Sequence, residues 1–421
     1  MATAQDLSKL FKVVYGKKLE NLIPESSILS KRIPFKGAEK VGEKFVQPVM
    51  LSSEQGFTYN SDGSAFALND AVTAVFKQAE VDGVELLLRT AISYRHASKA
   101  VEGPAAFASW TKLVVKNMVD SMAKRLEIGM LYGNAQTAGI GIVESVTDEA
   151  TADTGTMTLS EASFAPGIWA GAEGSELEIY SVDGDGVADS LRNAASITVT
   201  SVDLDDRKIT LAGTEAQLDA IAATDVIFFK GAKSNDMKGL HHIANVSGDL
   251  HGIDNSVYTL WKAHNEAISP AAPLTVSKVL EGVGKMVAKS GLNEDLILMV
   301  SPRCFEKVNA TGAANARSFD SSYSSSKQEE GSRNITYYGQ NGKIEIIPNI
   351  FCKNGDAFAL SPKDFKRVGS TDVTFTLPGK PSEEIFLQLA NNAGYELRCY
   401  SDQGIFTSSP SKLCHFSGIT V

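Results

Sequence analysis

Residues 89–143 constrain the fold most, because they predict a strand, one long helix and a second strand in succession. The run RTAISYRHASKA (89–100) is strand-like, and Gly103-Pro104 then opens a helix that Gly133-Asn134 closes. About 28 residues at ~1.5 Å each give a rod of roughly 42 Å. Its apolar residues recur at spacings of three and four: Phe107, Trp110, Val114, Met118, Met122 and Leu126.

A single apolar stripe covers only one layer, so this helix predicts the spine of a flat molecule rather than the middle of a globular enzyme. The opposite face is expected to meet water, and its residues are charged: Lys112, Lys116, Asp120 and Lys124.

Composition excludes several classes of protein. A length of 421 residues with 43% hydrophobic residues allows two or three domains. No apolar run reaches the length of a membrane helix, and the start lacks a signal peptide. Four scattered cysteines are typical of reduced thiols, not of a disulfide framework. A net charge of −10 argues against a surface that wraps nucleic acid as a whole, although a local basic face would still be compatible.

Before the spine, the chain predicts a long two-stranded arm. Residues 44–51 are strand-like, a polar tip follows, and 69–90 return as a second strand-like run. Isolated two-stranded ribbons are marginally stable, so the arm needs burial against something else. The alternative is a mobile surface loop. We expect docking on a neighbouring subunit, through these candidate interface residues: Phe45, Val49, Phe57, Tyr59 and Phe66.

After 139–143 the composition changes. Five short strand-like runs joined by Asp and Gly turns lie between 146 and 236, and they predict a small closed barrel or sandwich inserted into the chain. From 239 the pattern returns to mixed helix and strand, with a helix in 273–292 and a hairpin at Asn341-Gly342. The overall fold class is therefore α+β.

Few residues suggest chemistry. His241-His242, His251 and His264 lack any metal-binding helix motif, so we expect ordinary surface or hinge histidines. The stretch 282–286 imitates a phosphate loop but lies inside a predicted helix, where no cradle of free N–H groups forms. No catalytic residue and no cofactor can be nominated.

One acidic turn is a weak metal candidate. Asp183, Asp185 and Asp189 lie on a Gly-rich turn and could hold Ca²⁺, but Ala194 stands where an EF-hand needs its bidentate Glu. A plain Asp-Gly turn is the favoured interpretation. A calcium-binding β-rich adhesion or receptor-binding protein is the alternative function that this turn keeps open.

The order of elements resembles the major capsid protein of tailed bacteriophages. The resemblance rests on the basic N-terminal segment, the two-stranded loop, a spine that ends in LYGN (131–134), and GIG (139–141). Later stretches are similar too: GLHHIANVSGDLHGIDNSVYTLWKA, ITYYGQNGKIEIIPNIFCKNGDAFALSPKDFKRVG and NNAGYELRCYSDQGIFTSSPSKLCHFSGI.

The resemblance implies a domain plan and a function. The plan is an N-terminal arm (1–35), an extended loop (36–88), a peripheral domain with the spine helix (89–145), an inserted β domain (146–238), an axial domain (239–345) and a return with C-terminal strands (346–421). The implied function is non-enzymatic: pentamers and hexamers of the chain would tile an icosahedral head around double-stranded DNA.

The family also implies partners and a location. The partners are further copies of the chain, a portal protein, packaged DNA bound non-specifically at the inner face and, in some relatives, decoration proteins, with no membrane. Only about twenty residues precede the arm, whereas many relatives carry a long helical scaffolding segment there, so we expect a separate scaffolding protein. The location would be the virion shell, assembled in the cytoplasm of a bacterial host.

Overall fold

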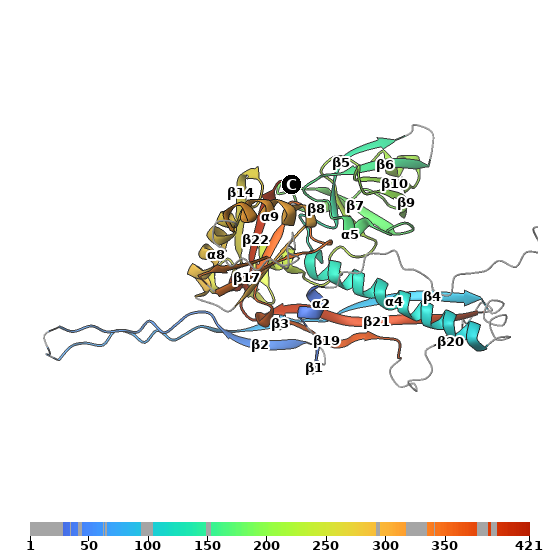
Figure 1. The fold of residues 1–421 in the computed structure, drawn as a ribbon. Helices are drawn as coiled ribbons and strands as arrows, with labels where there is room; N and C mark the ends of the chain where they lie inside the picture. The colour runs from blue at the N-terminus through green and yellow to red at the C-terminus, as the bar shows by residue number, and fades with distance from the viewer. Residues whose placement is uncertain are drawn as a thin grey trace, which may run out of the picture.

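The computed structural model shows an α+β chain in which a flat sheet and a long helix carry two further bodies and one projecting arm (Figure 1). The described residues are 28–33, 35–40, 44–61, 63, 65–93, 104–148, 153–291, 295–316, 335–340, 342–376, 386–388 and 394–421. The basic N-terminal segment and the Ser-rich stretch 317–334 lie outside them.

The spine is helix α4 (Pro104–Tyr132), with the ends that its flanking Pro and Gly predict. It lies across the flat sheet, which it contacts through the long strand β21 (Gly394–Thr407) (Figure 1). Met118, Met122 and Leu126 of the predicted stripe are buried, whereas the side chains of Phe107 and Trp110 lie outside the described part. Within the described ranges, no helix combines the length and apolarity that crossing a bilayer requires.

The flat sheet gathers strands from both ends of the chain. Strand β21 pairs along its length with β4, and on its other side with β19 and β20. Because β1 and β4 belong to this sheet, the free ribbon is shorter than the 36–88 loop expected from the sequence. The other members are β1 (Phe35–Lys40), β4 (Val84–Ser93), β19 (Phe365–Thr374) and β20 (Phe386–Gln388), and a short helix α2 (Leu29–Arg32) packs on α4.

The arm begins as an antiparallel pair, β2 (Phe45–Met50) and β3 (Phe76–Val81). Alternate residues of β2 are half-buried and exposed, and Pro48 is tolerated because β2 pairs on one side only. Beyond this pair, the segment that leaves β2 and the segment that returns to β3 continue as a thin ribbon, which projects far from the body (Figure 1). In the described part of this ribbon, two backbone hydrogen bonds join the two segments: Leu51 N–H donates to Val75 O (2.9 Å), and Gln55 N–H donates to Val72 O (3.1 Å).

Residues 141–229 build a barrel. Its strands pair in the ring β5-β6-β10-β9-β7-β11, and β11 returns to pair with β5, so the ring has no open edge; β8 lies outside on β7. The strands are β5 (Gly141–Asp148), β6 (Thr154–Leu159), β7 (Glu176–Val182), β8 (Ala188–Leu191), β9 (Ile197–Asp203), β10 (Lys208–Ala212) and β11 (Val226–Phe229), with short helices α5 (Pro166–Trp169) and α6 (Glu215–Leu218).

The third body is a six-stranded mixed sheet with helices beside it. Its strand order is β14-β22-β18-β15-β17-β16. The strands are β14 (His264–Ala272), β15 (Leu296–Val300), β16 (Ile335–Gly339), β17 (Gly342–Pro348), β18 (Ala357–Leu360) and β22 (Cys414–Ile419). The helices are α7 (Leu240–Asn245), α8 (Val276–Ser290) and α9 (Pro302–Ala316).

Small elements complete this body, and one glycine shows how tightly it packs. The small elements are β12 (Asp249–Leu250), β13 (Ile253–Asp254), η1 (Thr259–Trp261), η2 (Pro362–Asp364) and η3 (Pro410–Lys412). Gly282 lies within α8, where an added Cβ would come 2.3 Å from the Phe416 ring. The stretch 282–286 therefore lies inside a helix, as predicted, and Gly282 allows that helix to approach Phe416 closely.

Candidate assembly surface and buried junction

Among the described residues, the arm carries most of the large apolar side chains that are exposed. Three of the predicted interface residues are open to solvent: the exposed fraction is 63% for Phe57, 89% for Tyr59 and 51% for Phe66. Further exposed apolar residues of the ribbon are Met50, Leu68, Val72 and Phe76. Monomeric soluble proteins rarely leave such a set uncovered, so this ribbon has the character of an interface.

The other two predicted interface residues pack on their own chain. Phe45 and Val49 are partly buried against the core, and the Phe45 ring meets Phe406 edge-on at 5.2 Å between centroids. Glu80 on the returning strand donates its backbone N–H to the carbonyl of His251 at 2.9 Å. The base of the arm is thus held by its own body, and the tip is not.

The spine's polar face differs from the prediction at its C-terminal half. Lys116 is exposed, but Asp120 and Lys124 are partly buried, since the barrel covers this part of the helix. Lys124 Nζ donates to the carbonyl of Ala170 at 2.6 Å, and burial lowers the pKa of Lys124 to about 8. Arg125 lies over the Phe229 ring, with its guanidinium carbon 3.3 Å from the centroid. The single-stripe prediction fails here because the barrel, not water, meets the helix.

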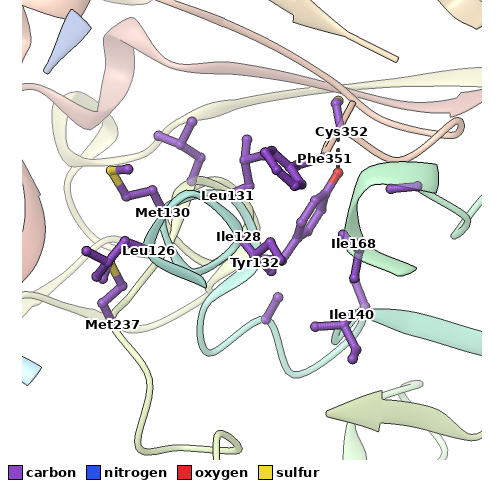
Figure 2. Close-up of a cluster of buried hydrophobic side chains, with 14 of the residues drawn as sticks. Leu126, Ile128, Met130, Leu131, Tyr132, Ile140, Ile168, Met237, Phe351 and Cys352 are labelled. Carbon is purple, nitrogen blue, oxygen red and sulfur yellow. Dashed lines mark hydrogen bonds between the residues drawn. The ribbon is translucent and has the colours of Figure 1, made fainter. Parts of the chain in front are cut away.

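The last two turns of α4 are buried on all sides, and they form the centre of a junction (Figure 2). Leu126 and Met130 lie with Met237 on one side of the helix, and Tyr132 points toward Phe351 and Cys352 on the other. At this point the spine, the barrel and the six-stranded sheet meet.

Tyr132 and Lys353 tie the end of the spine to the junction. The Tyr132 hydroxyl oxygen accepts the backbone N–H of Lys353 at 2.9 Å. Lys353 Nζ donates to the carbonyls of Ala138 and Gly139 at 2.8 and 2.9 Å and lies 4.3 Å from the centroid of the Tyr132 ring. Burial lowers the pKa of Lys353 to about 8, and Asp356 opposes that effect. A buried cation thus holds the turn that leads from the spine into the barrel.

Next to this lysine, three chain segments bring two histidines and one carboxylate together. His415 Nε2 and Asp356 Oδ1 are 3.2 Å apart, and Asn245 Nδ2 lies 3.2 Å from His415 Nδ1. Burial lowers the pKa of His241 to about 3. Burial alone would raise the pKa of Asp356, but the hydrogen bond and charge of His415 outweigh it and lower that pKa to about 2.

The other described histidines, His242, His251 and His264, are not members of this cluster. His242 Nδ1 is 2.9 Å from the carbonyl of Asn134, and burial lowers the pKa of His242. His251 is buried at the base of the arm, where its Nε2 has no partner and burial lowers its pKa to about 3. His264 Nε2 lies 3.0 Å from Glu266.

The acidic turn between β7 and β8 has the geometry of an ordinary Asp-Gly turn. Asp183 Oδ1 accepts the backbone N–H groups of Asp185 and Val187, each at 2.9 Å, and Asp189 Oδ2 accepts the Ser190 hydroxyl at 2.9 Å. The three carboxylates do not form a group at metal-ligand spacing, whereas His241, Asp356 and His415 do, within the described ranges. Nothing in this turn favours the calcium-dependent adhesion alternative.

One further buried contact gave no signal in the sequence. Glu127, buried in the spine, accepts the backbone N–H groups of Ile28, Leu29 and Ser30 at 2.9, 2.7 and 3.2 Å. Burial raises the pKa of Glu127, and these hydrogen bonds oppose the rise. The carboxylate therefore fixes the start of the described chain to the spine. In the sequence Glu127 looks like any helix-surface acid.

Comparison with known proteins identifies the fold. The sequence matches no family model and no curated protein. The structure is similar to the capsid asymmetric unit of cyanophage A-1(L), with a TM-score of 0.59 and 9% identity over 100% of each chain. It is also similar to the capsid of an empty GTA particle, with a TM-score of 0.50 and 8% identity over 99% of this chain and 98% of that one. The chain therefore has the fold of the major capsid proteins of tailed bacteriophages.

Proposed function

We propose that the chain is a major capsid subunit that assembles into pentamers and hexamers of an icosahedral head enclosing double-stranded DNA. The fold supports a shell protein, and the arm supports assembly from copies of one chain. Both matched structures are capsids rather than enzymes.

The single observation that carries this proposal is the arm, anchored at its base and uncovered at its tip. Phe57, Tyr59 and Phe66 expose apolar surface that their own chain does not cover. Burial of one such side chain contributes about 1.5–3 kcal/mol. Each contact contributes little free energy by itself. A subunit that is held at several edges gains the free energy of all its contacts together, so a closed shell is far more stable than a pair of subunits joined by one contact.

The domain plan of the family fits the three bodies. We assign the flat sheet and α4 to the peripheral domain, and the six-stranded sheet with α8 and α9 to the axial domain, which would meet its copies around each capsomer axis. The arm corresponds to the extended loop that lies over a neighbouring subunit, and the barrel is the inserted domain. The likeness in fold supports this assignment.

The partners follow from the same proposal. They are further copies of the chain, a separate scaffolding protein, a portal protein, and packaged DNA at the inner face, with decoration proteins on the outside of some shells. The location is the virion, assembled in the cytoplasm of a bacterial host. Only the family resemblance supports these partners and this location.

Negative-stain electron microscopy of the purified chain, at low and high salt, tests the proposal. We expect polyhedral shells, rings or tubes with a regular subunit lattice. The control is a chain in which residues 52–74 are replaced by a short Gly-Ser linker, which should fold and remain unassembled. A wild-type chain that stays a monodisperse monomer under all salt conditions contradicts the proposal.

A further inference from the structure

The junction holds a set of donor atoms that is suited to a metal ion. His241 comes from α7, Asp356 from the turn before β18, and His415 from β22. One donor atom from each lies within 4.8 Å of the other two. The rings of His241 and His415 lie next to each other in an edge-to-face arrangement, 5.1 Å apart between centroids at 68°.

The ring of His241 is free to take a ligand. No described residue forms a hydrogen bond to its ring nitrogens, although that side chain is buried. Imidazole nitrogens and carboxylate oxygens are the donor types that bind transition-metal ions in proteins.

We propose that His241, Asp356 and His415 bind one divalent transition-metal ion, with Zn²⁺ as the best match. Two imidazoles and one carboxylate are a common zinc set, and zinc sites with three protein ligands leave a fourth position for water. Hard ions prefer sites built from oxygen alone, so Mg²⁺ and Ca²⁺ should not compete. The ion would connect α7, the turn at Asp356 and the C-terminal strand β22 at the point where the three bodies meet.

Two neighbours limit the affinity. Asn245 Nδ2 also donates to the carbonyl of His241 at 2.9 Å, which turns its NH₂ group toward His415 Nδ1. His415 therefore carries its proton on Nε2, facing Asp356. A metal at Nε2 needs that proton on Nδ1 instead, with the Asn245 oxygen turned to accept it. The charge of Lys353 opposes a second cation as well. We expect a dissociation constant on the order of micromolar rather than nanomolar.

The first experiment measures metal binding by the full-length chain after treatment with a chelator. ZnCl₂ should raise the melting temperature by several degrees, and calorimetry should give one site per chain, whereas MgCl₂ and CaCl₂ should have no effect. Co²⁺ should give the visible absorption band of a four-coordinate site. No shift with zinc and no cobalt band would overturn the proposal.

Three variants locate the site. His241→Ala should abolish the zinc shift, whereas His264→Ala, which changes a histidine outside the cluster, should leave it intact. Asn245→Asp should strengthen zinc binding about tenfold, because a carboxylate accepts the Nδ1 proton of His415 and frees Nε2 for the metal. A zinc shift that persists in His241→Ala contradicts the assignment. If His241→Ala does not fold, the Asn245→Asp result decides: unchanged or weaker affinity overturns the proposal.

Discussion

The barrel and the arm are both built from short antiparallel strands, but they differ in how the edges of those strands are paired. In the barrel, β11 pairs with β5 on one side and with β7 on the other, so every strand of the ring has two neighbours. In the arm, β2 and β3 pair with each other and with no other described strand. The barrel closes within one chain, whereas the arm is a two-stranded ribbon whose apolar side chains stay exposed in the single chain.

The barrel and the arm also differ in how many charged residues they contain. Residues 146–238 contain 17 acidic and six basic residues, and all other positions together contain 33 acidic and 34 basic residues. Residues 146–238, most of which form the barrel, therefore have a net charge of −11, whereas the rest of the chain has a net charge of +1. A strongly charged surface of this kind favours contact with water. The arm, 44–81, has only six charged residues and a row of exposed apolar ones. The surface of the barrel is therefore rich in charge, and the surface of the arm is rich in exposed apolar side chains, as our proposal of an assembly interface requires.

The largest effect is expected inside the barrel. Trp169 is fully buried, and Trp169→Ala should lower the free energy of unfolding by about 3–5 kcal/mol, because the cavity is large. Chemical denaturation and the yield of soluble protein measure it. Trp169→Phe is the matched control and should cost less. An unchanged denaturation midpoint would mean that the barrel core does not depend on this side chain.

A second barrel residue tests the closing strand. The Asp225 carboxylate accepts two hydrogen bonds from the Arg192 guanidinium, at 3.0 and 3.2 Å, and one from the backbone N–H of Ala222 at 2.8 Å. Asp225→Asn keeps the shape but weakens these bonds, so we expect a loss of about 2–3 kcal/mol in a urea melt. The exposed Asp219→Asn is the control and should change stability by less than about 0.5 kcal/mol. Equal effects of the two variants would show that the Arg192 pair does not support closure.

The base of the arm should be sensitive to acid. Burial lowers the pKa of His251 to about 3, so between pH 6.5 and 3 the unfolded chain binds a proton that the folded chain does not. Stability is therefore lost as the pH falls through this window, by roughly 1–2 kcal/mol between pH 7 and 5.

The variant His251→Asn should remove this part of the pH dependence. Asparagine tolerates the left-handed backbone at this position, where φ is 56°. Other buried groups contribute equally to the pH dependence of both proteins. One of them is Asp236: burial raises its pKa to about 6, so its contribution to stability increases as the pH falls. Urea melts at pH 7 and 5 measure the difference. The same change in stability for both proteins would contradict the prediction.

The smallest effect on the subunit, and the sharpest on assembly, is expected at the tip of the arm. Phe57→Asp should change the stability of the single subunit by less than about 0.5 kcal/mol, because the side chain is 63% exposed. It should nevertheless prevent shells from forming, whereas Phe57→Leu should allow them. Microscopy and sedimentation measure this outcome. Normal particles from Phe57→Asp would show that the tip makes no important contact.

Regular elements were largely predictable because their signals are local. The spacing of Met118, Met122 and Leu126 and the flanking Pro104 and Gly133 predicted α4 with its observed ends. The five strand-like runs of 146–236 correspond to β6, β7, β9, β10 and β11. Within the barrel, the short strand β8 was missed, because ADSL has no apolar alternation.

The junction was not predictable for the opposite reason. Lys353 and Tyr132 are 221 positions apart, and His415 lies 59 positions from Asp356. No pattern of periodicity or spacing links such residues, since each looks in its own segment like a surface group. In the sequence, His241 and His242 stand next to each other, but the structure brings only His241 into the cluster with His415.

Local periodicity by itself determined where this chain forms its spine, its arm and its strands, because helix and strand repeats depend on neighbours a few residues apart. Tertiary structure alone decided that the strands of 141–229 close into a ring, that the barrel meets the spine at Lys124 and Arg125, and which polar groups share the buried junction. Those outcomes depend on contacts between distant segments, whose loops must close before any contact can form.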